Sequence, residues 1–145
     1  MNQADQAHRQ LTIITLALVG GMTLFAGVVA MLHTGGSMAP AWDGGTTLRL
    51  AAAVVGVGLL AVGAMLTPRP GSAPGAPAGG HETPGSILNR TIAAQAVREG
   101  AGMLGGVVGL LTGDLLLMAA LVAASAAAMI VALPSREEMR RRVGY

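Results

Sequence analysis

The sequence predicts an all-α, polytopic membrane protein with four transmembrane helices, and three observations support this fold class. First, 52% of the 145 residues are apolar and only 11% are charged, whereas soluble domains carry about 25% charged residues. Second, the chain contains four apolar runs, each long enough to cross a hydrocarbon layer of about 30 Å. Third, aromatic residues are scarce and Gly and Ala are abundant, which suits the close packing of membrane helices.

The first two runs predict a transmembrane hairpin within residues 1–66. Its spans cover about residues 11–32 and 48–66, joined by a turn-rich connection in which Trp42 is a candidate interfacial anchor. A cleaved signal peptide is the alternative for the first run, because Val28-Val29-Ala30 resembles a cleavage site. The run is longer than the roughly 7–15 apolar residues of a signal peptide, which favours an uncleaved span.

The second half of the chain predicts another hairpin. Residues 67–86 form a Pro/Gly/Ala-rich linker that has too little apolar mass to fold by itself. The second hairpin covers residues 87–133, with spans at about 87–111 and 115–133, and a basic tail follows at 134–145. We expect the two hairpins to pack as a bundle.

The arginines predict the orientation of these spans. All nine basic residues are Arg, and one side of the predicted topology carries Arg9, Arg69, Arg90, Arg136, Arg140, Arg141 and Arg142. Arg49 is the exception on the opposite side. The positive-inside rule then places both termini and the linker in the cytoplasm, and we expect a bacterial-type inner (plasma) membrane.

The two hairpins show a sequence repeat. A shift of 79 positions aligns the first span with the third and matches Ala17, Gly21, Gly27, Val28, Val29 and Leu32 with Ala96, Gly100, Gly106, Val107, Val108 and Leu111. A duplicated hairpin is one interpretation, running in the same direction in both copies. The alternative is chance, because segments built from few apolar residue types match easily.

Small and polar residues predict the helix-packing faces. In the third span, spacings of three and four place one set of residues on a single face: Thr91, Gln95, Arg98, Gly102, Gly105, Gly109 and Thr112. In the fourth span, Ala120, Ala124 and Ala128 recur at steps of four. Small residues at such spacing allow close helix contact. Ser125, the one hydroxyl amid these alanines, is expected to bond back to its own helix.

Arg98 and Glu99 are the candidate functional residues. If the membrane begins at Ile92, they lie roughly 9–11 Å inside the hydrocarbon. Arg98 can extend back to the cytoplasmic headgroups, whereas Glu99 is too short. Gln95 is within reach of both. Three interpretations of Glu99 stay open: a reversible proton or cation site, a structural clasp between helices, or a residue near water because the membrane boundary lies elsewhere.

Other chemistry has little support in the sequence. There is no cysteine, and the three histidines (His8, His33 and His81) show no metal-ligand spacing, so we expect no metal and no cofactor. No set of Ser, His and Asp has the spacing of a catalytic site, and we expect no enzyme. The only basic cluster is the C-terminal arginines, without stacking aromatics, so we expect no nucleic-acid partner.

The segment around Glu99 resembles a known family. Its residues Glu99, Gly102, Leu104, Gly105, Val108, Gly109 and Leu110 are similar to the carboxylate helix of rotary-ATPase proteolipids, the subunit c family. Some members of that family are fused pairs of hairpins with the essential carboxylate in the second hairpin. The resemblance implies a ring of copies in which Glu99 is alternately protonated and released.

The sequence thus supports two functional hypotheses. The first is a scaffold or accessory subunit of a membrane complex, or a homo-oligomer, with Arg98, Glu99 and Gln95 making buried contacts between helices. The second is a proton- or cation-coupling proteolipid or minimal transporter in which Glu99 titrates. In both cases the lipid bilayer is the first partner.

Overall fold

The computed structural model describes residues 3–37, 45–67 and 83–143, and these residues form helices without any strand. In chain order the five helices are α1 (Gln3–Thr34), α2 (Gly45–Leu66), α3 (Pro84–Thr112), α4 (Leu115–Val131) and α5 (Arg136–Val143). The predicted anchor Trp42 and linker positions 68–82, which include Arg69 and His81, lie outside the described residues.

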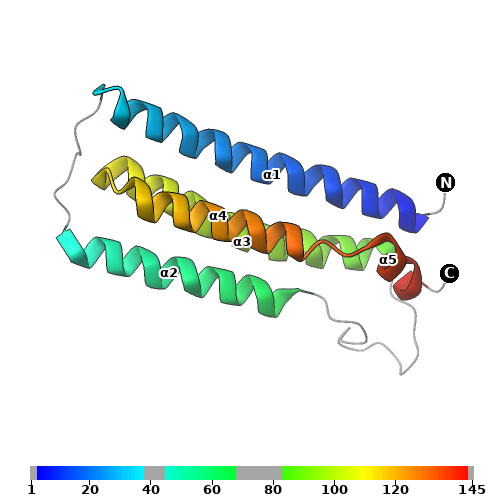
Figure 1. The fold of residues 1–145 in the computed structure, drawn as a ribbon. Helices are drawn as coiled ribbons and strands as arrows, with labels where there is room; N and C mark the ends of the chain where they lie inside the picture. The colour runs from blue at the N-terminus through cyan, green and yellow to red at the C-terminus, as the bar shows by residue number, and fades with distance from the viewer. Residues whose placement is uncertain (1–2, 38–44, 68–82, 144–145) are drawn as a thin grey trace.

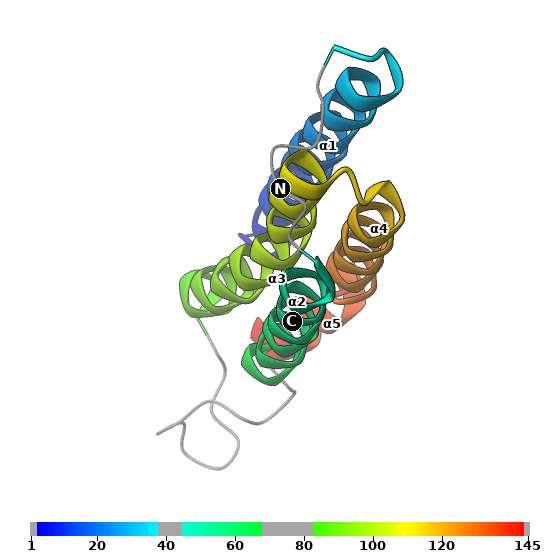
Figure 2. The same cartoon turned by 90° about the vertical axis from the view of Figure 1, so that its left-hand side faces the viewer.

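α3 is the central helix of the bundle. It packs against α1, α2 and α4, with α1 and α2 on opposite sides of it (Figures 1 and 2). α1 and α2 make almost no contact with each other, although they follow one another in the sequence. α3 and α4 do form a packed antiparallel pair, so the predicted repeat is not matched by a repeated packing of the two hairpins.

Two helices, α1 and α2, are each long and apolar enough to cross a membrane. A third candidate arises if α4 and α5 are counted together, because they are bent by 51° at a short break. α4 by itself has 17 residues, slightly fewer than the about 20 that a span requires. α3 is long enough to cross a membrane but is not among these candidates, because Arg98 and Glu99 lower its mean hydropathy.

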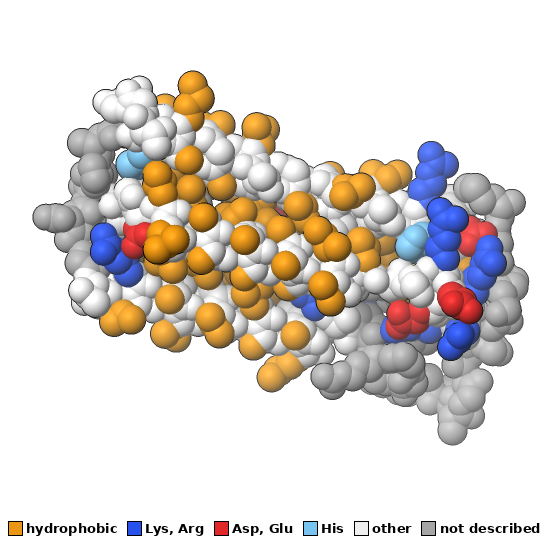
Figure 3. All heavy atoms as spheres, viewed as in Figure 1, with side chains coloured by type: hydrophobic (Ala, Val, Ile, Leu, Met, Phe, Trp, Pro, Cys, Tyr) orange, Lys and Arg blue, Asp and Glu red, His pale blue; other side chains and the backbone are white. Residues whose placement is uncertain are grey.

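The surface has an apolar middle and charged ends. Apolar side chains cover the face in Figure 3 between the two ends, where acidic and basic groups gather. Many large apolar side chains on this surface are exposed, including Leu24, Val54, Leu116 and Val131. Such a wide exposed apolar belt is typical of a protein surrounded by lipid.

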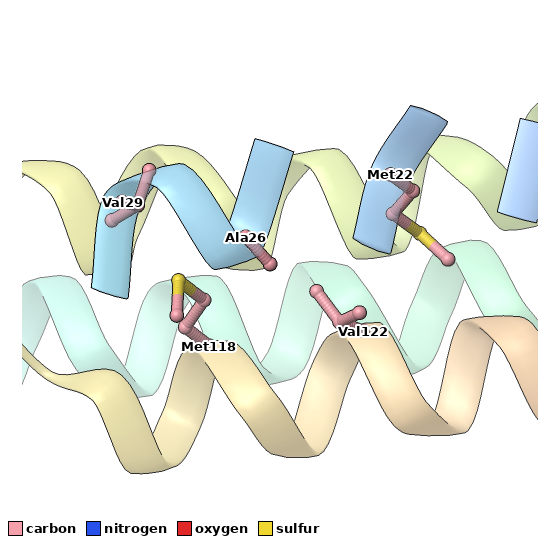
Figure 4. Packing of buried hydrophobic residues seen from close by; sticks show 5 residues of the cluster. All are labelled: Met22, Ala26, Val29, Met118 and Val122. Carbon is pink, nitrogen blue, oxygen red and sulfur yellow. The ribbon is translucent and has the colours of Figure 1, made fainter. Parts of the chain in front are cut away.

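The largest core cluster joins α1 to α4. Met22, Ala26 and Val29 of α1 face Met118 and Val122 of α4 (Figure 4). The sulfur-containing side chains are flexible enough to fill the irregular space between these helices. α1 is thus held to the α3–α4 pair although its own sequence neighbour α2 lies on the far side.

The glycine face of α3 lies inside the bundle. All seven residues of the predicted face, from Thr91 to Thr112, are buried. At Gly105 an added Cβ would lie 2.8 Å from Leu121 Cβ and 3.3 Å from the Met118 carbonyl oxygen, so α4 crosses α3 with backbones in close approach. Gly102 similarly leaves room for Met22 of α1.

The alanine face predicted for α4 does not pack against the other helices of this chain. Ala120 and Ala124 are exposed and Ala128 is half-buried. α4 instead buries the larger residues Met118, Leu121, Val122, Ser125 and Met129. The reason is complementarity, because the glycines of α3 leave hollows that alanines would not fill and that Met and Leu side chains do.

The turn between α3 and α4 is fixed by two residues. Gly113 adopts a left-handed conformation with φ of 70°, and its N–H donates to the Gly109 carbonyl at 2.9 Å, which ends α3. The Asp114 carboxylate then caps α4 by accepting from the Leu117 N–H at 3.0 Å. Asp114 also pairs with Arg49 Nε of α2 at 3.2 Å, which ties this turn to the start of α2.

The C-terminal tail contains a helix, α5, that the sequence did not predict. Its Met139 is fully buried among Ala7 and Leu11 of α1 and Ile87 of α3. Arg140 of α5 pairs with Asp5 of α1 at 3.0 Å. α1 begins about two turns before the predicted span. The start of α1 and helix α5 lie at the same end of the bundle (Figure 1).

Candidate functional site

Arg98 lies inside the bundle, with only 3% of its surface exposed. Gly63 of α2 provides the space for its aliphatic stem, because a Cβ there would approach Arg98 Cγ to 2.7 Å and the Ala94 carbonyl oxygen to 3.3 Å. α2 can therefore approach α3 closely only while position 63 lacks a side chain. Gly63 was not predicted from the sequence as part of this site.

The Arg98 guanidinium has two neutral hydrogen-bond partners. Its Nη1 donates to Gln95 Oε1 one turn earlier on α3, at 3.5 Å. Its Nη2 donates to the hydroxyl of Thr67, which follows the last residue of α2 and itself donates to the Gly63 carbonyl at 2.9 Å. The Arg98 side chain thus joins α3 to the end of α2.

Two further hydrogen bonds join α3 to α4. The Gln95 amide donates from Nε2 to the Met129 carbonyl at 2.9 Å, and the Ser125 hydroxyl donates to the Arg98 carbonyl. The prediction that Ser125 bonds back to its own helix is wrong, because its fully buried hydroxyl faces α3. We call Thr67, Gln95, Arg98, Ser125 and the Met129 carbonyl the polar clasp.

Glu99 lies outside the polar clasp. It is half-buried and, within the described part of the chain, makes no ion pair with Arg98 and accepts no hydrogen bond. One step along a helix turns a side chain by about 100°, which places Glu99 on the flank of the α3 face that Arg98 and Gln95 share. Gln95, expected within reach of both charges, bonds to Arg98 and not to Glu99.

Arg98 and Thr67 also line a cavity between α2 and α4. Its volume is about 370 Å³, and its remaining lining is apolar: Leu60, Ala64, Ala128, Val131 and Ala132. A second cavity of about 170 Å³ adjoins it toward α5 and shares Thr67, Val131 and Ala132. Glu138 and Arg142, which line this second cavity, pair with each other.

Candidate metal ligands do not gather in the described part of the chain. Across residues 3–37, 45–67 and 83–143, no three His, Cys, Asp or Glu side chains come together as metal ligands would. In the interior, Gln95, Arg98 and Ser125 serve contacts between helices. Fold and site together define a helical membrane protein whose central helix is joined to two neighbours by a polar clasp.

Comparison with known proteins adds no relative. No protein-family model, no curated protein and no solved structure matches this chain. The function must therefore be inferred from the polar clasp, the cavity and the surface.

Proposed function

We propose that this protein is a small integral membrane protein that acts as a scaffold or accessory subunit of a membrane complex. Helices α1 to α4 each cross the bilayer, and both termini lie in the cytoplasm of a bacterial-type inner membrane. The apolar belt between charged ends (Figure 3) supports this placement. So does the gathering of Arg136, Arg140, Arg141 and Arg142 at one end of the bundle.

The observation that carries the scaffold role is how the buried polar groups are used. Gln95, Arg98 and Ser125 all bond between helices, so they hold α2, α3 and α4 in one arrangement. Polar residues inside membrane bundles commonly act in this way. The exposed alanines Ala120 and Ala124 of α4 leave a second close-packing surface that suits a helix of another subunit or another copy.

The mass of the native particle tests this role. The full chain of 14.4 kDa would be purified in mild detergent and measured by native mass spectrometry. We expect either several copies or this chain with a different protein. A lone monomer at every detergent concentration and protein level would contradict the proposal.

The topology is tested separately by thiol labelling. Because the chain has no cysteine, single-cysteine variants at Ser37, Asp114 and Ser135 report position without background. We expect Ser37 and Asp114 to be labelled from outside the cell, and Ser135 only after the membrane is opened. Labelling of Asp114 and Ser135 from the same side would show that α4 does not cross.

A second candidate function rests on Glu99. Its carboxylate is half-buried and has no partner among the described residues, which suits a group that gains and loses a proton. The resemblance to rotary-ATPase proteolipids points the same way. In that case Glu99→Gln abolishes ion transport in reconstituted vesicles while the fold is kept, and carbodiimide labels Glu99 less as the pH rises. No labelling at any pH would exclude it.

A further inference from the structure

The Arg98 guanidinium is a buried positive charge with neutral partners only. Arginine stays charged in proteins and carries five N–H donors. Two of these donors bond to described residues, Gln95 Oε1 and the Thr67 hydroxyl, and no ion pair with a described carboxylate reaches Arg98. A buried charge is costly unless an opposite charge accompanies it. Among the described residues, the Arg98 guanidinium therefore has no ionic partner, and some of its N–H groups have no acceptor.

The position of the guanidinium indicates where an anion would come from. Arg98 bonds to Thr67, the residue directly after the end of α2 at Leu66. The side chain thus extends from the interior of α3 to the level at which a neighbouring span ends. In the proposed topology this is the boundary between hydrocarbon and cytoplasmic headgroups, where lipid phosphates lie.

The shape of the cavity between α2 and α4 indicates what kind of anion fits. Arg98 and Thr67 form its polar end, and the rest of its wall is apolar. Ala64 is exposed and Val131 is 84% exposed, so the cavity opens sideways toward the surrounding lipid. A pocket with one charged end and apolar walls suits an amphipathic anion, which has a charged group at one end and an apolar chain at the other.

The charged residues that line the adjoining cavity do not cancel the positive charge of Arg98. Glu138, the acidic residue that lines it, is bonded by Arg142 of the same helix. Since these two charges offset each other, the net charge of the residues that line the two cavities is that of Arg98, and the neighbouring Glu99 lines neither cavity. The field at the polar end therefore favours an anion.

We propose that the cavity between α2 and α4 binds the phosphate group of an anionic membrane lipid, with the remaining N–H groups of Arg98 as donors and an acyl chain along Leu60, Ala64 and Ala128. The inference rests on the proposed membrane topology and is independent of the scaffold role. An anionic lipid is favoured over free phosphate because the open side of the cavity faces hydrocarbon and its walls are apolar.

Lipid binding to the purified full chain tests the proposal. Native mass spectrometry and thermal unfolding in detergent would compare added phosphatidylglycerol, phosphatidylcholine and inorganic phosphate. We expect phosphatidylglycerol to bind at least fivefold more tightly than phosphatidylcholine and to raise the Tm, with no effect of millimolar phosphate. Arg98→Gln should remove the difference between the two lipids.

A matched pair of variants controls for misfolding of the Arg98 variant. Ala128→Leu fills the cavity while every residue of the polar clasp is kept, and Ala123→Leu makes the same change at an exposed position of α4 that lines neither cavity. We expect Ala128→Leu to lose the preference for phosphatidylglycerol and Ala123→Leu to keep it. Equal binding of both lipids, equal protection by inorganic phosphate, or an unchanged preference in Ala128→Leu would each overturn the proposal. None of these outcomes bears on the particle mass that tests the scaffold role.

Discussion

The Gln95 side-chain amide donates a hydrogen bond of 2.9 Å to the Met129 main-chain carbonyl, 34 positions later in the chain. Met129 lies in the last turn of α4, where carbonyls lack a partner within the helix. The next possible donor, the Leu133 N–H, bonds to Ile130 instead. Gln95 therefore caps the end of α4 from a neighbouring helix.

Gln95→Leu should destabilise the bundle by about 0.6 kcal/mol and by at most about 1.7 kcal/mol, the average and the maximum for hydrogen bonds between membrane helices. The substitution keeps the volume of the side chain but leaves the Met129 carbonyl without a donor. Unfolding of detergent-solubilised protein by sodium dodecyl sulfate measures the effect. Gln10→Leu, at an exposed position of α1, is the control and should change little; equal effects of the two variants would refute the capping role.

Gly105→Ala should cost about 1–3 kcal/mol, as overpacking does in well-packed cores. Its Cβ would meet the Met118 carbonyl oxygen at 3.3 Å and Leu121 Cβ at 2.8 Å, and neither atom can move without a shift of α4. Gly58→Ala on α2 is the matched control, since its Cβ has open space. A thermal unfolding assay should rank Gly58→Ala at or above the parent protein and Gly105→Ala below it.

Asp114→Ala should destabilise the protein more than Asp114→Asn. Both variants lose the ion pair with Arg49, but Asn can still accept from the Leu117 N–H and cap α4. The loss of such a cap costs about 1 kcal/mol, whereas a pair with an exposed arginine contributes less. Equal losses of stability in the two variants would show that the ion pair, and not the cap, matters here.

The docking of α5 onto α1 should weaken at acid pH. Asp5 precedes the apolar part of α1, and hydrogen bonds from Arg140 hold the pKa of its carboxyl below the usual value. A lowered folded-state pKa contributes stability at pH values above the unfolded pKa of about 3.9, and this contribution is lost as the pH falls through the folded pKa.

Hydrogen exchange of residues 136–143 measures this docking. Asp5→Asn should exchange faster than the parent protein at pH 7, and the two should converge near pH 2. His8 Nδ1, which lies 3.1 Å from the Pro134 carbonyl oxygen, is present in both proteins and does not affect the comparison. A difference that persists at acid pH would contradict the role of Asp5.

The buried face of α3 could be predicted because its spacing specifies one side of a helix. Glycine, threonine and glutamine recur there at steps of three and four within an apolar segment, which is typical of a helix-packing face, and all seven positions are buried. The face of α4 could not be predicted in this way. Alanines lie on several sides of that helix, and its contact face depends on the hollows of α3, which only the folded bundle defines.

The polar clasp was predicted in part. Arg98 and Gln95 stand out in the sequence because polar groups in a span need partners. Thr67, Ser125 and the Met129 carbonyl lie 27 to 34 positions away from them, and no local pattern indicates such pairings. α5 was missed for a similar reason, because its sequence offers only two apolar residues, Met139 and Val143, amid charges.

The separation of α1 and α2 by α3 has a consequence for biogenesis. In the proposed topology α1 and α2 enter the bilayer before α3 is synthesised, and they have almost no surface in common. Each would then have to be stable as a separate inserted helix, which agrees with each being long and apolar enough to cross a membrane by itself. In the same topology α3, which carries Arg98, inserts between α1 and α2, so its insertion is coupled to the assembly of the bundle.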